Sequence, residues 1–300
     1  MKFVAHITLF ILLGPLLVGV VRKTKAFLSC RQGAPVFQPF LDLWKLFRRG
    51  IVRSTSASWV FDLSAPVVLG ASLVLAAATP LWSREVPLPM HFILFLYLMA
   101  LPRFFQTLAG LDTGSAFGGL GSSREVAVSA MAEPALILSF CGLAYLGSAD
   151  TVSGMVAVVP PGRIPWRPEV ILLAGTMFLL LLAENARIPV DDPATHLELT
   201  MIHEAMVLDH AGVDLAMIQL ASGVRLVLFS AIVSGILFPQ ALSLPTFLAI
   251  PAAVVEVVLS GALIGAVEAG MARMKLSRVA SYLLIATVLA AIALSVRYAG

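Results

Sequence analysis

Long apolar stretches recur along the chain, and shorter polar segments separate them. A helix needs about 20 mostly apolar residues to cross a bilayer, and several stretches approach or exceed that length. They are residues 4–21, 65–82, 91–110, 126–146, 169–183, 213–237, 247–267 and 279–297. The pattern therefore predicts an all-α integral membrane protein, a single polytopic domain over residues 1–300 with about eight transmembrane helices.

Composition also favours a membrane protein over a soluble one. Hydrophobic residues make up 59% of the chain and charged residues 12%, against roughly 45–50% and about 25% in typical soluble proteins. The two cysteines, Cys30 and Cys141, form no CxxC motif and no Cys/His cluster, so we expect neither a metal site nor a redox cofactor in this chain. Its basic residues accompany no nucleic-acid-binding motif, so nucleic acid is not an expected partner.

Lysine and arginine are concentrated in alternate connecting segments. With the N-terminus outside, the spans place residues 22–64, 111–125, 184–212 and 268–278 in the cytoplasm. Those segments hold 13 Lys and Arg residues, and the opposite side holds 5, as the positive-inside rule requires. Only Lys2 precedes the first apolar run, whereas Arg22, Lys23 and Lys25 follow it, so we expect a retained helix and not a cleaved signal peptide.

The first cytoplasmic segment contains a helical pattern of its own, in residues 37–49. Its apolar residues recur at spacings of three and four, and polar residues occupy the opposite face. The apolar residues are Phe37, Phe40, Leu41, Trp44 and Phe47. Pro39 suits the first turn of a helix, and Gly50 follows its end. This predicts an amphipathic helix in the membrane interface; a solvated linker helix is the alternative.

Ionisable residues inside the apolar regions are functional candidates, because each costs at least ~2.5–3.5 kcal/mol to insert. They are Arg103, Glu133, Glu184, Arg225, Glu256 and Glu268. Glu125, Ser129 and Glu133 follow one another at intervals of four, which predicts a ladder along one helix face that carries protons from the cytoplasm into the bilayer. The alternative is a structural ion pair, and we expect Arg225 and Glu256 to compensate each other's charge, directly or through one other group.

Acids and histidines crowd the 184–212 segment. The acids are Glu184, Asp191, Asp192, Glu198 and Glu204, and the histidines are His196, His203 and His210, each seven residues from the next. On one continuous helix all three histidines would share a face. Residues seven apart lie about 10 Å from one another along a helix, too far to share one metal ion. The segment therefore predicts a docking surface or a pH-responsive proton antenna.

Several motifs resemble the membrane anchor subunits of group 4 [NiFe] hydrogenases. They are Arg103-Phe104-Phe105, Leu111-Asp112-Thr113-Gly114-Ser115, Gly121-Ser122-Ser123-Arg124-Glu125 and Glu133-Pro134. This family, formate hydrogenlyase subunit 4 and hydrogenase-4 component C, is related to the H subunit (subunit 1) of respiratory complex I. The resemblance implies a subunit of the bacterial cytoplasmic (inner) membrane that couples electron transfer in an attached hydrogenase-like module to ion movement in antiporter-like subunits.

The residue pattern and the resemblance together assign candidate roles. The expected proton path contains Asp112, Arg124, Glu125, Glu133, Glu184, Asp191, Glu198, Arg225, Glu256 and Glu268. The expected docking face contains Arg31, Gln38, Asp42, Lys45, His196, His203, Glu204 and His210. The implied partners are hydrogenase-like large and small subunits, a ferredoxin-like iron–sulfur subunit and antiporter-like membrane subunits. The [NiFe] centre and the iron–sulfur clusters belong to those partners, and quinone binding stays open.

The chain departs from formate hydrogenlyase in three places. His196 replaces an acid of the family's Ala-Glu-x-Glu-Leu stretch, the segment Met206–Gly212 replaces a Glu-Tyr-Ser-Gly stretch, and Glu256 stands where those subunits carry Lys. These changes point to hydrogenase 4 or to a related complex without hydrogenase activity. Two other hypotheses are the H subunit of a complex I, with a quinone-binding chamber, and a stand-alone secondary transporter, although the chain has no internal inverted repeat.

Overall fold

The structure is a computed structural model, and it describes residues 2–156, 167–192, 201–239 and 244–299. Its regular structure is helical. The helices are α1 (Lys2–Leu28), α2 (Gln38–Phe47), α3 (Trp59–Ala78), α4 (Phe92–Asp112), α5 (Ala116–Gly147), α6 (Val152–Val156), α7 (Pro168–Glu184), α8 (His203–Val207), α9 (Gly212–Leu237), α10 (Thr246–Gly270) and α11 (Leu276–Ala299).

Each predicted span coincides with one long helix, in the order α1, α3, α4, α5, α7, α9, α10 and α11. Among the described residues, seven of these helices are long and apolar enough to cross a membrane. The remaining one, α7, has 17 residues. The predicted all-α membrane fold is confirmed, and the protein is a multi-pass membrane protein.

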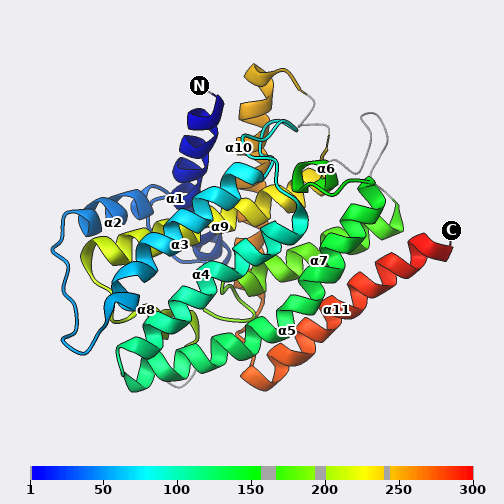
Figure 1. The fold of residues 1–300 in the computed structure, drawn as a ribbon. Coiled ribbons are helices and arrows are strands. Elements are labelled where there is room, and N and C mark those ends of the chain that lie inside the picture. The colour runs from blue at the N-terminus through cyan, green and yellow to red at the C-terminus, as the bar shows by residue number, and fades with distance from the viewer. Residues whose placement is uncertain (1, 157–166, 193–200, 240–243, 300) are drawn as a thin grey trace.

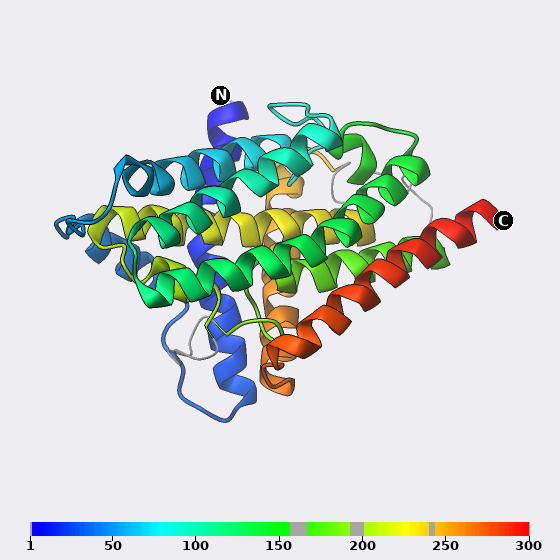
Figure 2. The same ribbon diagram turned by 60° about the horizontal axis from the view of Figure 1, so that its bottom comes forward.

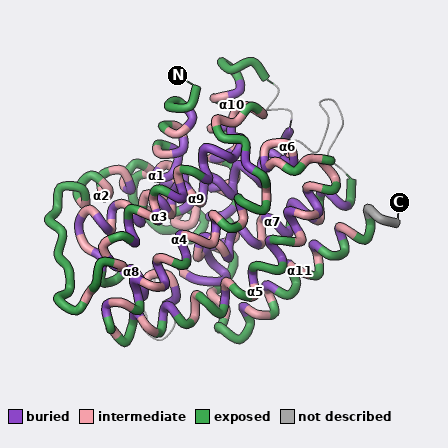
Figure 3. Tube along the Cα trace, in the orientation of Figure 1, coloured by how far each residue is buried: buried purple, intermediate pink, exposed green. Residues whose placement is uncertain are grey.

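The long helices form two sets that cross steeply. Figure 2 shows α1 and α10 side by side, crossing the helices that run across the view. Helix α9 lies at the centre, and most of its residues are buried. The chain surface is formed largely by exposed turns of the outer helices, as Figures 1 and 3 show for α5 and α11.

Glycines allow the crossing helices to approach closely. A Cβ atom built on Gly14 of α1 would lie 3.0 Å from the carbonyl carbon of Gly223 in α9. On α10, a Cβ atom at Gly265 would lie 2.8 Å from the Cβ of Thr24 in α1. Small residues are the usual means of bringing membrane helices this close, and here they hold the end of α1 against α10.

Four connecting segments meet at one end of the bundle, which we call the loop end. Ser115, between α4 and α5, donates a 2.9 Å hydrogen bond to Asp209 in the segment before α9. The backbone N–H of Met274, after α10, donates a 2.9 Å hydrogen bond to the carbonyl of Pro189, after α7. Ser56, before α3, donates a 3.1 Å hydrogen bond to the carbonyl of Thr113, after α4. Each of the four segments that we predicted to share one side of the membrane therefore contacts another of them.

Helix α2 also lies at the loop end, within the predicted range of residues 37–49. Phe37, Leu41, Trp44 and Phe47 are exposed on this chain. The guanidinium of Arg48 lies 4.5 Å from the centre of the Trp44 ring. The amphipathic helix is confirmed, and its exposed apolar face suits a helix lying in the membrane interface.

Candidate functional site

Four charged side chains from four helices come together inside the bundle. Arg103 of α4 lies 2.7 Å from Glu184 at the end of α7, and it donates a 3.1 Å hydrogen bond to Ser129 of α5. Arg225 of α9 interacts electrostatically with Arg103, Glu125 and Glu184. We call Arg103, Glu125, Glu184 and Arg225 the inner ion group, and all four belong to positions singled out from the sequence.

The inner ion group contains two arginines and two glutamates, so opposite charges can balance. Arg103 and Glu184 expose only 11% and 5% of their side chains. Removing ions from water costs several kcal/mol each, and the partner's charge must offset that cost. A change in one member therefore alters the proton affinity of the others, which suits a group that takes up and releases protons.

A second set of charges lies nearer the loop end, and we call it the outer ion group: Lys25, Arg187, Asp191, Glu268 and Arg273. Asp191 lies 2.7 Å from Arg273. Glu268 lies 3.5 Å from Arg187 and 3.6 Å from Lys25. Burial raises the pKa of Asp191 although Arg273 opposes the shift, and burial lowers the pKa of Arg187 although Glu268 opposes it. Asp191 and Glu268 therefore each lie next to a cation that offsets the cost of burying the carboxylate, as Glu184 does in the inner ion group.

His203, the first residue of α8, lies between the two ion groups. Its backbone N–H donates a 3.1 Å hydrogen bond to Asp191 of the outer group. Burial, together with the charges of Arg225 and Arg187, lowers the pKa of His203 to about 3, so the ring is neutral at physiological pH. A neutral imidazole has one N–H donor and one acceptor nitrogen, so it can pass a proton between its neighbours.

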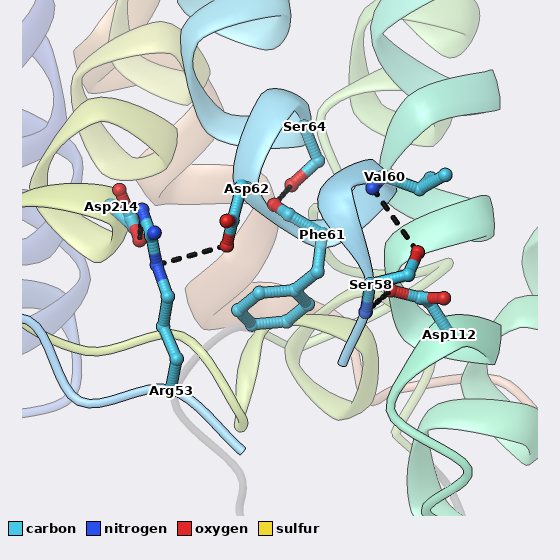
Figure 4. Close-up of polar contacts among 8 residues, drawn as sticks. All are labelled: Arg53, Ser58, Val60, Phe61, Asp62, Ser64, Asp112 and Asp214. Atoms are coloured by element: carbon cyan, nitrogen blue, oxygen red, sulfur yellow. Dashed lines mark hydrogen bonds and ion pairs between the residues drawn. The ribbon is translucent and has the colours of Figure 1, made fainter. Parts of the chain in front are cut away.

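A third cluster holds the segment before α3 at the loop end (Figure 4). Arg53 lies 3.0 Å from Asp62 and 3.4 Å from Asp214. Ser58 is the N-cap of α3, and its backbone N–H donates a 2.6 Å hydrogen bond to Asp112. Asp112, a predicted proton-path residue, thus contacts the start of α3.

Glu133, a residue of α5, lies at the surface of the chain, on the side where α5 packs against α4. It is exposed, and together with Arg103 it lines a cavity of about 460 Å³ whose other walls are mostly apolar side chains. Its charge interacts with that of Glu184. The predicted ladder on α5 therefore joins the inner ion group at Glu125 and Ser129 and faces outward at Glu133.

Glu256 lies elsewhere in the bundle. It accepts a hydrogen bond from Ser234 of α9, whereas Arg225 interacts with the inner ion group. The expectation that Arg225 and Glu256 compensate each other is therefore wrong. Nine residues along α9 separate Arg225 from Ser234, a rise of about 13 Å. Arg225 and Glu256 therefore lie at different positions along the length of α9.

The predicted docking residues of the first segment lie on or beside α2. Gln38 donates a 2.9 Å hydrogen bond to Asp42, and Arg31 is exposed in the segment before α2. Asp42 and Lys45 line a cavity of about 470 Å³, to which Glu204 of α8 also contributes. Elsewhere on this end, Arg124 of α5 donates a 2.9 Å hydrogen bond to the carbonyl of Met201, before α8.

His203 and His210 do not share a helix, which contradicts that prediction for this pair. Helix α8 ends at Val207, and the ring of His210 stacks on Phe61 of α3 with centroids 4.0 Å apart. His196 and Glu198 lie outside the described residues. In the part of the chain that the structure describes, no three His, Cys, Asp or Glu side chains are grouped as a metal ion would require.

The burial of His210 predicts an acid-sensitive contact at the loop end. Burial lowers its pKa to about 4, although Asp214 and Asp209 oppose the shift. Because the unfolded pKa is about 6.5, the unfolded chain binds the proton first, so this contribution to stability is complete above about pH 6.5 and is lost toward pH 4. At its largest it amounts to about 3 kcal/mol.

We expect the melting temperature of the detergent-solubilised protein to fall between about pH 7 and pH 5. The variant His210→Phe keeps a ring against Phe61 but cannot bind the proton, so its melting temperature should fall less. An equal fall in both proteins would contradict this role for His210.

The family of the chain follows from its sequence match. The model of the family described as NADH dehydrogenase (NADHdh) matches residues 1–298. The chain belongs to this family.

Similar proteins agree with the resemblance to hydrogenase membrane subunits. The chain is 32% identical to Hydrogenase-4 component C of Escherichia coli (strain K12) over 237 residues, covering 78% of this chain and 74% of that protein. It is 30% identical to Formate hydrogenlyase subunit 4 of the same organism over 271 residues, covering 87% of each. With the H subunit of NADH-quinone oxidoreductase from Anaplasma phagocytophilum (strain HZ) it shares 28% over 238 residues, 72% of this chain and 68% of that one.

The same fold occurs in a solved structure. A chain of the membrane-bound sulfane sulfur reductase (MBS), an archaeal respiratory membrane complex, superposes with a TM-score of 0.84. The match covers 99% of both chains at 19% sequence identity. The arrangement in which α1 and α10 lie side by side and cross the other long helices therefore belongs to a fold shared with a chain of a respiratory complex.

In this member of the NADH dehydrogenase family, the sequence pattern revealed the carboxylates of the site better than their cations. Lys25 and Arg273 pair with Asp191 or Glu268, but neither was among the predicted site residues. Both lie in basic segments, where the positive-inside rule already accounts for a charge. The usable signal was indirect, because a buried acid implies a cation nearby.

Proposed function

We propose that the chain is the membrane anchor and coupling subunit of a hydrogenase-type respiratory complex related to complex I. In this role it docks the hydrophilic electron-transfer module and links redox chemistry there to proton or sodium translocation. The main support is the row of ionisable side chains that runs from the outer ion group through His203 to the inner ion group. Similarity to Hydrogenase-4 component C and Formate hydrogenlyase subunit 4 supports the choice of complex.

The mechanism rests on the segment between α7 and α9. It carries Asp191 of the outer ion group and His203, and it contributes Glu204 to the cavity beside α2. A shift of α8, driven by the docked module, changes how close His203 lies to Arg225 and Arg187. That alters the charge balance of the inner ion group, whose carboxylates then exchange a proton with the imidazole.

The proposed orientation places the loop end in the cytoplasm of a bacterial cell and the N-terminus outside. The excess of Lys and Arg in the loop-end segments supports it. The proposed partners at this end are hydrogenase-like large and small subunits and a ferredoxin-like subunit, which hold the [NiFe] centre and the iron–sulfur clusters. Charged residues such as Asp42, Lys45 and Glu204 suit a contact whose orientation is set by complementary charge.

An antiporter-like membrane subunit is the proposed cover for the α4–α5 surface. Glu133 is exposed there, although it lies well inside a membrane-spanning helix. A carboxyl group that faces lipid at this depth is costly. A neighbouring subunit that covers the cavity next to Glu133 would both remove that cost and receive the proton.

A second candidate is the H subunit of a complex I, with a quinone-binding chamber. The similarity to the H subunit of NADH-quinone oxidoreductase supports it, and the cavity of about 470 Å³ beside α2 offers a location. Several charged side chains line that cavity, including Arg22, Asp42 and Lys45. Small-molecule sites are mostly apolar with few polar groups, so this lining favours the first proposal.

Isolation of the complex through an affinity tag on this chain, in a mild detergent, tests the proposal. Mass spectrometry should identify a large subunit with paired CxxC motifs, a ferredoxin-like subunit and an antiporter-like subunit. Quinone retained in a one-to-one ratio would favour the complex I hypothesis. A chain that purifies alone and transports an ion in liposomes would reject the proposal in favour of a secondary transporter.

A further inference from the structure

The end of the bundle opposite the loop end carries a cavity far from the outer ion group. It measures about 230 Å³ and is lined by the first turns of α1, the segment after α3 and the start of α10. Its polar side chains are Lys2, His6, Ser83, Glu85 and Thr246. Along α1, His6 precedes Lys25 of the outer ion group by 19 residues, a rise of about 28 Å.

His6, which lines the cavity, carries a buried hydrogen-bond acceptor. Its side chain is 0% exposed, and Nε2 lies 3.1 Å from the carbonyl oxygens of both Ala76 and Thr79. Carbonyl oxygens only accept, so Nε2 carries the hydrogen and, in the neutral ring, Nδ1 is an acceptor. Nδ1 is buried and has no partner in the described part of the chain. A ligand with an N–H or O–H donor would satisfy it.

The start of α10 provides donors in the same cavity. The helix begins at Thr246, and its N-cap is Pro245, whose side chain cannot accept a capping bond. The N–H groups of Leu248 and Ala249 donate to the carbonyl of Pro245, so those of Thr246 and Phe247 are the ones directed out of the helix. Together with the helix dipole, such N–H groups favour a phosphate. Lys2 and Ser83 add an ammonium group and a hydroxyl at the rim.

Glu85 supplies the opposite charge at the rim. Its carboxylate lies 3.4 Å from the ammonium of Lys2, and both side chains are exposed. The cavity therefore presents cationic and hydrogen-bonding groups for an anion, and a carboxylate with an imidazole acceptor for a cation. That combination fits a zwitterion whose cationic end bears hydrogens.

The depth of the cavity fits the headgroup layer of a membrane. Trp82 lines it, with its ring 6.2 Å from that of His6. Tryptophan is enriched where membrane proteins meet the headgroups. We propose that this cavity binds the headgroup of an aminophospholipid, with the phosphate at the start of α10 and at Lys2 and the ammonium donating to His6 Nδ1 and to Glu85.

The lipid preference of the full-length protein tests this proposal. The protein is equilibrated with equal amounts of phosphatidylethanolamine, phosphatidylcholine and phosphatidylglycerol, and the bound lipid is counted by native mass spectrometry. Choline carries no N–H donor, and phosphatidylglycerol lacks the cation. We expect roughly tenfold preferential retention of phosphatidylethanolamine, the effect of about one charge-assisted hydrogen bond.

Two variants locate the site. His6→Phe removes the acceptor and keeps a ring next to Phe10 and Trp82, and Glu85→Gln changes an exposed side chain. Both should reduce the preference for the ethanolamine headgroup over choline. Asp150→Asn, an exposed carboxylate near His91 on another segment of the chain, is the matched control and should leave the preference unchanged.

Several results would overturn the proposal. Equal retention of the three lipids by the unmodified protein would mean that water satisfies Nδ1. An unchanged preference in Glu85→Gln would place the lipid elsewhere, and this holds even if His6→Phe fails to fold. Soluble phosphoethanolamine that displaces the lipid at millimolar concentration would identify a site for a free metabolite, because a lipid gains most of its affinity from its acyl chains.

Discussion

Arg103→Leu should prevent this subunit from accumulating in the membrane. The substitution leaves the carboxylate of Glu184 buried without the arginine that lies 2.7 Å away. Breaking a buried ion pair from one side typically costs about 3–5 kcal/mol, which is a large part of the stability of an ordinary domain. The measurement is the amount of tagged protein in the membrane fraction and its melting temperature in detergent.

The double variant Arg103→Leu, Glu184→Leu distinguishes a charge effect from a packing effect. With both charges removed, the loss should be smaller than the sum of the two single losses by about 0.5–3 kcal/mol. Arg31→Leu, at an exposed position, is the control and should accumulate normally. Strictly additive losses would contradict the pairing of Arg103 with Glu184.

Glu133→Gln should abolish ion translocation while electron transfer to a soluble dye continues. Glu133 lines the cavity that leads outward from Arg103, and an amide cannot take up and release a proton in that place. The variant keeps the size of the side chain and removes a charge, so assembly should be preserved. Translocation is measured with the purified complex in liposomes.

Tyr97→Phe is a suitable control for Glu133→Gln, because Tyr97 lines the same cavity and the change leaves Glu133 in place. It should translocate normally. Full translocation by Glu133→Gln would exclude this carboxylate from the proton path and leave it a structural role.

Local sequence patterns were sufficient to predict the helices. The run at residues 213–237 became α9, and the spacing within residues 37–49 became α2. Both predictions depend on residues within a few turns of one another, where helical periodicity and the cost of polar groups in lipid act directly. The buried acid Glu184 was found for the same reason.

Contacts between helices could not be predicted in this way. Arg225 and Glu256 both lie in apolar spans, yet their partners depend on how α9 meets α7 and α10, which no local pattern encodes. The seven-residue spacing of His203 and His210 suggested one helix face, but α8 ends at Val207. His203 instead lies against the ion groups, and His210 packs on Phe61.

The most direct test of the account is the number of protons translocated per electron in liposomes that contain the purified complex with His203→Phe. The imidazole is neutral before the change, so the substitution removes a donor and an acceptor without removing a charge. We predict that the ratio falls by about a hundredfold, the lower end of the effect of a positioned proton-transferring group, while dye reduction and the ratio in His210→Phe stay normal. An unchanged ratio in His203→Phe would contradict proton transfer between the two ion groups through this residue.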